Sequence, residues 1–148
     1  MNITNKRSKN EHQKLYGECL CGSVKYEIKA PFRDVVNCYC SECRKTSGNF
    51  VSATRVSNSQ LNIQQDIGLR WYKNSLSQKG FCQHCGANLF WRCVPDNGKV
   101  SIMAGCLQPN NGLKVAGHIF IADKSDFHEI TDSAPQYQLA DVEYPEMT

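Results

Sequence analysis

The cysteines constrain this chain more than any other feature of its sequence, because seven of the nine fall into three short clusters. The clusters are Cys19-Leu20-Cys21, Cys38-Tyr39-Cys40-Ser41-Glu42-Cys43 and Cys82-Gln83-His84-Cys85. Four thiolates are the usual ligand set of a structural zinc ion, so the two pairs together predict one closed site. The triad has one thiol fewer. It predicts a second zinc with an open coordination position, which is typical of catalytic zinc.

The rest of the sequence indicates a reducing compartment for these thiols. No apolar run approaches the roughly 18 residues that span a bilayer, and residues 1–14 lack the apolar segment of a secretory signal. We therefore expect a cytoplasmic protein, not bound to a membrane, in which clustered cysteines bind metal instead of forming disulfides. The odd count of nine also excludes full pairing within one chain.

The formal charge of +3 is no argument for a nucleic-acid partner, because it assumes neutral thiols. Ligating cysteines are thiolates. Seven of them add seven negative charges and two Zn²⁺ add four positive ones, so the loaded protein has a net charge of about zero.

The hydrophobic pattern predicts a mainly β, single-domain fold over residues 15–138, between a polar tail at 1–14 and an acidic tail at 139–148. Val24, Tyr26 and Ile28 alternate with charged residues, as in a half-buried strand. Further strands are expected at 50–56, 61–63, 69–72, 89–93, 100–104 and 118–122, separated by turn-forming residues. One short helix is expected at 41–47, with Ser41 as its N-cap.

The spacing of the two pairs suits one shared metal ion. Residues i and i+2 of a strand point to the same face, so Cys19 and Cys21 can bind one ion. Cys82 and Cys85 frame a tight turn, and Gly86 follows where a positive φ is often needed. A dithiol redox pair at Cys82 and Cys85 is the alternative, but it would leave the first pair without a role.

The triad combines two features that stabilise thiolates. Cys38 and Cys40 share a strand face, and Cys43 lies at the start of the expected helix, directly before Arg44 and Lys45. The same alternation points Tyr39 away from the metal. The alternative is a second closed site, whose fourth ligand would come from elsewhere in the chain. The candidates for that ligand are Cys93, Cys106, His84 and His118.

Three motifs carry a family resemblance. They are Gly17-x-Cys19-x-Cys21-Gly22-x-Val24-x-Tyr26, Cys38-x-Cys40-Ser41-x-Cys43-Arg44-Lys45-x-Ser47-Gly48 and Phe81-Cys82-x-x-Cys85-Gly86-x-x-Leu89. Together they resemble the glutathione-dependent formaldehyde-activating enzyme family, which includes centromere protein V. The resemblance extends over about residues 15–137 and implies a β-tent fold around zinc.

The resemblance also implies a division of the metals. Cys19, Cys21, Cys82 and Cys85 would hold a structural zinc, and the triad would hold a second zinc at the active site. The activity attributed to the family is a carbon–sulfur lyase reaction that condenses formaldehyde with glutathione. The chain departs from the family pattern at Tyr39, where His is usual, at Phe127, where Trp is common, and at Cys106, where a small residue is usual.

The leading hypothesis is therefore zinc-assisted addition of a glutathione-like thiol to a small aldehyde, and its reversal. Zinc on Cys38, Cys40 and Cys43 would do the chemistry, and Arg44 would offset negative charge or bind a substrate carboxylate. One rival is a non-catalytic zinc scaffold that binds a protein or nucleic acid. The other is a thiol redox or metal-storage protein.

Overall fold

Two β-sheets, one of three strands and one of seven, make up most of the structure, a computed structural model that describes residues 12–140. The strands are β1 (Lys14–Glu18), β2 (Val24–Lys29), β3 (Val35–Cys38), β4 (Val51–Ser57), β5 (Leu61–Asp66), β6 (Leu69–Lys73), β7 (Ser77–Cys82), β8 (Asn88–Cys93), β9 (Lys99–Met103) and β10 (Val115–Ile119). The α-helix is α1 (Ser41–Ser47), and short 3₁₀ turns lie at η2 (Asn58–Gln60), η3 (Ala104–Cys106) and η4 (Ile121–Asp123). The predicted mainly β fold is confirmed.

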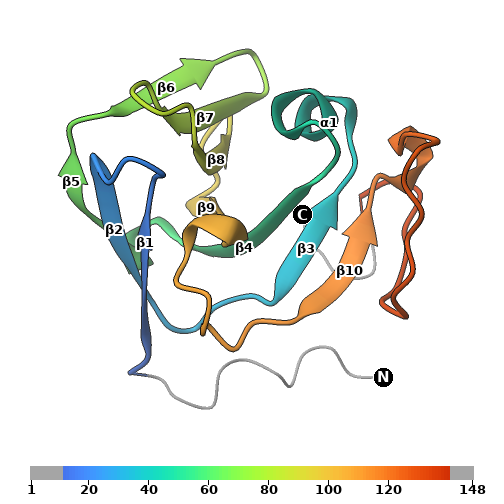
Figure 1. The fold of residues 1–148 in the computed structure, drawn as a ribbon, viewed down its shortest axis with the longest axis horizontal. Helices are drawn as coiled ribbons and strands as arrows, with labels where there is room; N and C mark the ends of the chain where they lie inside the picture. The colour runs from blue at the N-terminus through green and yellow to red at the C-terminus, as the bar shows by residue number, and fades with distance from the viewer. Residues whose placement is uncertain (1–11, 141–148) are drawn as a thin grey trace.

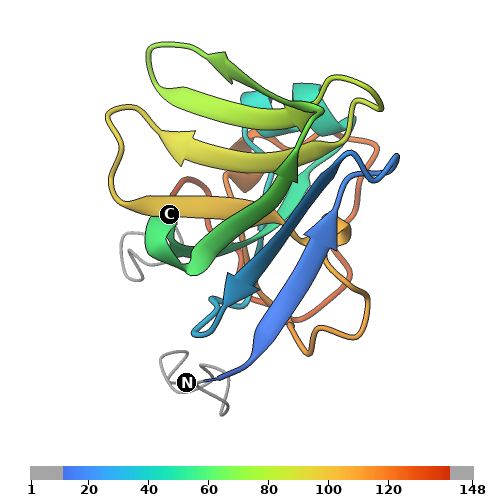
Figure 2. The ribbon, with the colours of Figure 1, turned by 90° about the vertical axis from the view of Figure 1, so that its left-hand side faces the viewer.

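The smaller sheet has the order β1-β2-β5, and the larger one has the order β10-β3-β4-β9-β8-β7-β6 (Figure 1). All pairs are antiparallel except β10 with β3, which is parallel. The strands of the smaller sheet run obliquely to β7, β8 and β9 (Figure 2). The helix α1 lies in the connection from β3 to β4, so it stands at the end of the larger sheet (Figure 1).

The main core lies between the two sheets, where each contributes its apolar face. Tyr26 of β2 meets Phe90 of β8 edge to face, with 4.8 Å between the ring centroids. Fully buried aliphatic side chains of both sheets complete this core: Leu15, Val24, Ile28, Leu89, Val100 and Ile102. Cys19 and Cys82 belong to the same cluster, so the cysteine pairs are attached directly to the packed interior.

The alternation predicted for β2 holds except at one residue. Glu27 is only 6% exposed, although its place in the pattern predicts a solvent-facing side chain. Asn62 of β5 donates an amide hydrogen to Glu27 (3.3 Å), and Lys14 of β1 pairs with it at 3.6 Å. Neighbouring strands on both sides thus cover and satisfy this carboxylate, which is a tertiary effect that the strand's own sequence does not contain.

Three local predictions are wrong. Neither Cys19 and Cys21 nor Cys38 and Cys40 share a strand face, because the first pair lies in the turn between β1 and β2 and β3 ends at Cys38. Cys40, not Ser41, is the N-cap of α1, since its side chain accepts from the backbone N–H of Cys43. The strand expected at 118–122 is β10, which begins at Val115 and ends at Ile119. It ends there because Phe120 adopts a left-handed backbone conformation with φ of 56°, which a strand does not accommodate.

Most of both predicted tails lies outside the described residues, namely 1–11 and 141–148. Lys14, placed in the N-terminal tail, is the first residue of β1 and pairs with Lys29. Leu139, placed in the C-terminal tail, accepts a backbone hydrogen bond from Phe120. Within residues 12–140, no helix has the length and apolar character needed to cross a membrane.

Candidate metal centres

The two cysteine pairs converge on one point. Cys19 and Cys21 lie in the turn from β1 to β2, Cys82 ends β7, and Cys85 lies in the turn before β8. The four sulfur atoms all lie within 4.8 Å of one another. The Sγ–Sγ distances are 3.7 Å for Cys19–Cys21 and 3.8 Å for Cys21–Cys82. A tetrahedron with Zn–S bonds of about 2.3 Å has S–S edges of about 3.8 Å, so this cluster fits zinc without rearrangement.

Two small residues that the sequence analysis missed complete this site. The Ser23 hydroxyl lies 3.3 Å from Sγ of both Cys21 and Cys82. Its contact with Cys82, together with hydrogen bonds from the backbone of Cys85 and His84, lowers the pKa of Cys82 to about 6. Gly68, between β5 and β6, passes so close that a Cβ there would lie 2.7 Å from the Cys82 sulfur. Gly68 is therefore required by the close approach of the β5–β6 turn to the four-cysteine cluster. The predicted positive φ at Gly86 is confirmed at 76°.

The triad forms a second cluster, at the junction of β3 and α1. Cys38 ends β3, Cys40 caps the helix, and Cys43 lies in its first turn. The three sulfur atoms lie within 4.8 Å of one another. Hydrogen bonds from the thiols of Cys38 and Cys43, and from the backbone N–H of Cys43 at 3.4 Å, hold the pKa of Cys40 well below its ordinary value. Cys40 is therefore held in the thiolate form, which binds metal, whereas the contact with Cys40 raises the pKa of Cys38 to about 12.

None of the four alternative ligands joins this cluster within residues 12–140. Cys106 donates its thiol hydrogen to the carbonyl of Asn88 at 3.2 Å, and it packs against the main core. Both ring nitrogens of His118 have other partners, as described below. His84 lies beside Gly68 at the four-cysteine site. Among the described residues this cluster therefore contains three thiols and no fourth candidate ligand. That the three thiols bind a metal stays a prediction.

A cavity of about 520 Å³ adjoins the triad. Cys38, Cys40 and Cys43 line it, whereas none of the four cysteines of the other cluster does. One face of the larger sheet forms much of its floor, because alternate residues of β3, β4 and β9 line it. They are Val36 and Cys38 of β3, Val51, Ala53 and Arg55 of β4, and Ser101 and Met103 of β9. On β8 the lining residues are Asn88, Phe90, Trp91 and Cys93. The helix α1 forms one wall through Glu42, Cys43 and Thr46.

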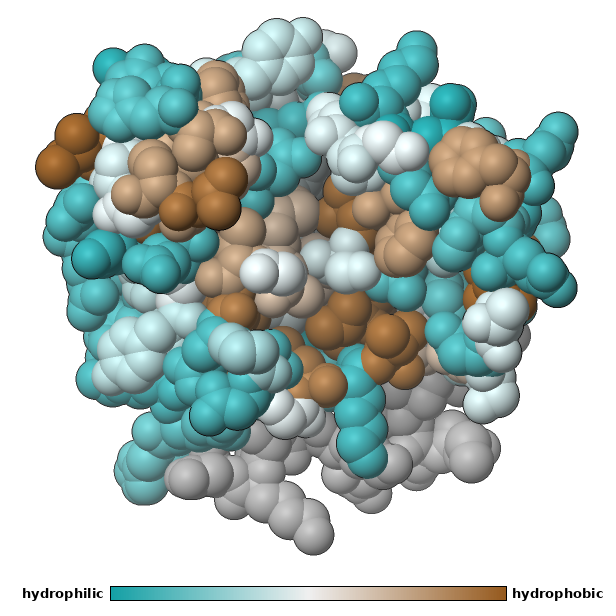
Figure 3. Space-filling model, in the orientation of Figure 1, coloured by the Kyte–Doolittle hydropathy of each residue, from teal (hydrophilic) through white to brown (hydrophobic). Residues whose placement is uncertain are grey.

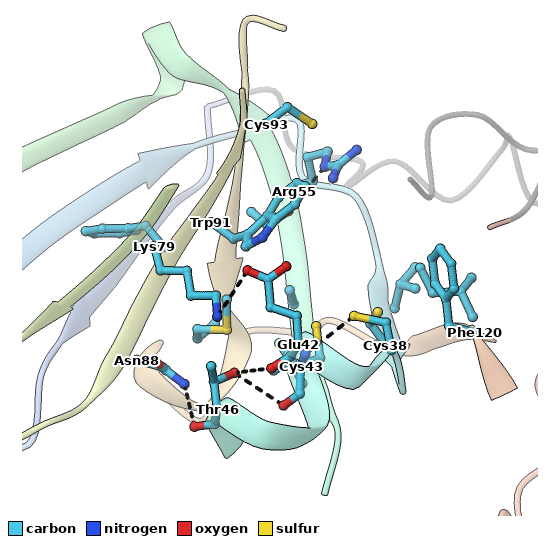
Figure 4. A pocket seen from close by; sticks show the side chains of 18 of the residues that line it. Cys38, Glu42, Cys43, Thr46, Arg55, Lys79, Asn88, Trp91, Cys93 and Phe120 are labelled. Carbon is cyan, nitrogen blue, oxygen red and sulfur yellow. Dashed lines mark hydrogen bonds and ion pairs between the residues drawn. The ribbon is translucent and has the colours of Figure 1, made fainter. Parts of the chain in front are cut away.

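A charged pair on this wall ties α1 to the sheet. The Lys79 ammonium lies 3.0 Å from Oε1 of Glu42, and the buried Ser77 hydroxyl donates to the same oxygen at 2.7 Å. Asn88 adds an amide hydrogen bond to the carbonyl of Thr46 (Figure 4). Glu42 stands between Cys40 and Cys43 in sequence, so these contacts fix the turn that carries two of the three thiols.

On the side away from the cavity, Tyr39 begins a hydrogen-bonded network that runs from the buried interior to the exposed carboxylate of Asp132. The Tyr39 side chain is 1% exposed, and its hydroxyl lies 3.1 Å from Nδ1 of His118 and 3.4 Å from Nε2 of His128. Nε2 of His118 lies 2.9 Å from the carboxylate of Asp132. The hydrogen bond to His118 holds the pKa of Asp132 below its ordinary range.

The donor and acceptor roles in these hydrogen bonds follow from the groups at the two ends of the network. Ser52 donates to Oδ1 of Asn37 at 2.6 Å, so the Asn37 amide presents hydrogen to Nδ1 of His118. Asp132 accepts at Nε2, so Nε2 carries the hydrogen and Nδ1 is the acceptor. Tyr39 therefore donates to His118. From the sequence, His118 is a candidate metal ligand, and nothing points to His128, because the partners of both side chains lie far away in sequence.

Arg44, predicted as a catalytic residue, follows Cys43 on α1 but is not among the residues that line the cavity. Its backbone carbonyl accepts from Gly48, which ends the helix. Its role in charge compensation therefore stays a prediction.

The comparisons with known proteins agree with this geometry. The sequence profile described as "Glutathione-dependent formaldehyde-activating enzyme" matches residues 14–123, well over half of the chain. The chain belongs to the glutathione-dependent formaldehyde-activating enzyme family. No curated protein matches it. Among solved structures, it is similar to a crystal structure of a protein from Rhodobacter sphaeroides, a Northeast Structural Genomics target, with a TM-score of 0.57 and 21% identity over 82% of this chain and 98% of the other. That likeness supports the fold.

The family match ends at Asp123, yet the chain beyond it contributes to the site. His128 and Asp132 both belong to the hydrogen-bonded network that reaches Tyr39. Tyr39 is one of the three positions that the resemblance marked as departures from the family pattern. Phe127, the second departure, is 73% exposed and makes no part of the cavity lining.

Proposed function

We propose that this protein is a zinc-dependent carbon–sulfur lyase that adds a glutathione-like thiol to a small aldehyde and reverses that addition. One observation carries the proposal: the three-thiol cluster lines a cavity large enough for a substrate, and the four-thiol cluster does not. An open metal site beside a cavity suits catalysis, and a closed site at the core suits folding. The reducing cytoplasm is the compartment in which such free thiolates persist.

In this proposal Cys19, Cys21, Cys82 and Cys85 hold a structural zinc, and Cys38, Cys40 and Cys43 hold a catalytic one. Zinc on three thiolates supplies Lewis acidity and favours the thiolate form of a bound thiol. The reaction joins the sulfur to the carbonyl carbon, and the C=O π electrons move to the oxygen, which receives the thiol's proton. Atoms and charge balance without an oxidant or reductant.

The chain's own residues supply position and environment. The N-cap geometry of Cys40 and the Glu42–Lys79 pair fix the thiols before substrate arrives, so little reorganisation is needed during reaction. The apolar walls of the cavity exclude water and hold the reactants close together, which in favourable cases lowers a barrier by about 7–11 kcal/mol. Arg44 beside Cys43 is proposed to offset the negative charge of the thiolates.

The test compares Cys40→Ser with wild type in zinc-loaded full-length protein. We expect zinc content to fall from about two to about one per chain. NMR measures the rate at which formaldehyde and glutathione interconvert with their adduct. We expect this rate to fall to that of the uncatalysed reaction. Cys106→Ser is the matched control, because a serine hydroxyl can still donate to Asn88, and it should keep both metals and full turnover.

Full turnover in Cys40→Ser would overturn the proposal. Wild-type protein that holds two zinc ions but does not exceed the uncatalysed rate would favour the scaffold. Ready release of zinc on mild oxidation would favour the redox or storage protein.

A further inference from the structure

The cavity beside the triad has three cationic side chains among its described lining residues, and two of them are engaged within the protein. Lys79 pairs with Glu42 at 3.0 Å. Arg33 donates from Nη2 to the carbonyl of Ala53 at 2.9 Å and from Nε to the carbonyl of Asp34 at 3.3 Å. Neither cation therefore needs a ligand to satisfy it.

Arg55 differs from both. Its Nε donates to the Ser101 hydroxyl at 3.2 Å, but its Nη1 is buried and has no hydrogen-bond partner. Burial lowers the pKa of Arg55, although a guanidinium stays charged in proteins. A buried donor on a charged group is costly when it lacks an acceptor. An anion bound in the cavity would remove that cost.

Most of the remaining lining is apolar. Val36, Val51, Ala53, Phe90, Ile119 and Phe120 all face the cavity. Hydrophobic side chains also gather in the middle of the face shown in Figure 3, with hydrophilic ones around them. A ligand that fills this volume must therefore present a hydrophobic body, because strongly polar groups would find few partners there.

The guanidinium and the thiols lie at opposite ends of the cavity. Cys38 is paired with Val51 across β3 and β4, and Arg55 lies four residues further along the same face of β4. At about 3.3 Å per residue, the two ends are about 13 Å apart along the strand. Figure 4 shows Arg55 and Cys93 at one end of the view, and Cys38 and Cys43 at the other.

We propose that Arg55 binds the carboxylate of a thiol substrate with an apolar body, whose sulfur reaches Cys38, Cys40 and Cys43. This inference rests on the proposed function and names its substrate class: hydrophobic thiols with one carboxylate. Glutathione carries two carboxylates and an ammonium group, more charge than one unpaired guanidinium matches. The larger share of the cavity would then bind hydrocarbon.

The test uses 6-mercaptohexanoate and 6-mercaptohexanol, which differ only in the terminal group, and glutathione as the competing substrate. Calorimetric titration of zinc-loaded full-length protein, without aldehyde, should show the carboxylate binding at least tenfold more tightly than the alcohol and than glutathione. Shortening the acid to 3-mercaptopropionate should weaken binding by about threefold to fourfold for each methylene removed.

Arg55→Met should bind both six-carbon thiols equally, and Arg55→Lys should keep part of the preference for the acid. Binding of 6-mercaptohexanol by each variant reports that the cavity is still folded. The control is Arg92→Met, because Arg92 lies over the Trp71 ring at 4.7 Å and does not line the cavity. It should preserve the wild-type preference.

The inference is overturned by equal binding of the two thiols to wild type, by a preference that survives in Arg55→Met, or by tighter binding of glutathione. Turnover with formaldehyde, measured separately, distinguishes this result from the proposed function. Arg55-dependent binding with no turnover of any thiol would contradict the lyase and support the binding site. Turnover of glutathione at the same rate in wild type and Arg55→Met would support the lyase and contradict the binding site at Arg55.

Discussion

At the scale of single residues, the close approach of two strands explains why β1 contains a glycine at residue 17. Gly17 is paired with Tyr26 of β2, and the Tyr26 ring lies directly over it. A Cβ at residue 17 would overlap the phenol ring, which is 1% exposed and packed against Phe90. The glycine therefore makes room for a core side chain from the neighbouring strand.

This packing predicts that Gly17→Ala is destabilising. We expect the free energy of unfolding in urea to fall by about 1–3 kcal/mol, because the Tyr26 ring must move within a close-packed core. Gly105→Ala is the matched control, since a Cβ there meets nothing within 4 Å. Equal stability of the two variants would contradict this account of Gly17.

At the scale of elements, the Tyr39–His118–Asp132 chain joins three parts of the structure. Tyr39 follows β3, His118 belongs to β10, and Asp132 lies in the segment after η4. The parallel pairing of β10 with β3 places Asn37 and His118 at the same register, which aligns this chain. The C-terminal segment is therefore tied to the strand that carries Cys38.

This connection predicts the effect of Tyr39→Phe. The variant removes a buried hydroxyl donor from Nδ1 of His118 and should reduce the free energy of unfolding by about 1–2 kcal/mol. The measurement is urea unfolding of zinc-loaded protein, with zinc content determined on the same sample. Tyr72→Phe, at a residue that is 58% exposed on β6, should unfold like wild type. A similar loss in both variants would show that the hydrogen-bonded network contributes nothing specific.

At the scale of the whole molecule, the two cysteine clusters differ in what they connect. The four-cysteine cluster joins the β1–β2 turn of the smaller sheet to β7 and the β7–β8 turn of the larger one, and Cys21 and Cys82 are 61 positions apart in sequence. The triad spans only the junction of β3 and α1. Closing a long loop removes more entropy from the unfolded chain than closing a short one.

We therefore expect Cys82→Ser to destabilise zinc-loaded protein more than Cys40→Ser does. By the loop lengths alone, the losses of unfolding free energy in the two variants differ by about 2 kcal/mol. The attachment of Cys82 to the main core increases this difference. The measurement is thermal unfolding of the two variants and of wild type after chelation. Chelated wild type should unfold at or below the temperature of Cys82→Ser. A lower unfolding temperature for Cys40→Ser would contradict the assignment of the structural metal.

The sequence by itself determined what depends on neighbours in the chain. The cysteine spacings predicted both clusters, and the helix at 41–47 followed from local signals. Alternation located β2, although not the burial of Glu27. The triad, the helix and the alternation of β2 are short-range features, which neighbours in the chain fix within a few residues. The joining of the two cysteine pairs is not, and it was predicted from the ligand count of zinc.

Only the tertiary structure decided which distant residues surround the two cysteine clusters. Ser23 and Gly68 approach Cys82 from other turns, and His118 meets Tyr39 across 79 positions of sequence. Arg55 reaches the cavity of the triad because β4 pairs with β3. Such contacts depend on sheet order and register, and the sequence of each strand alone is compatible with several pairings.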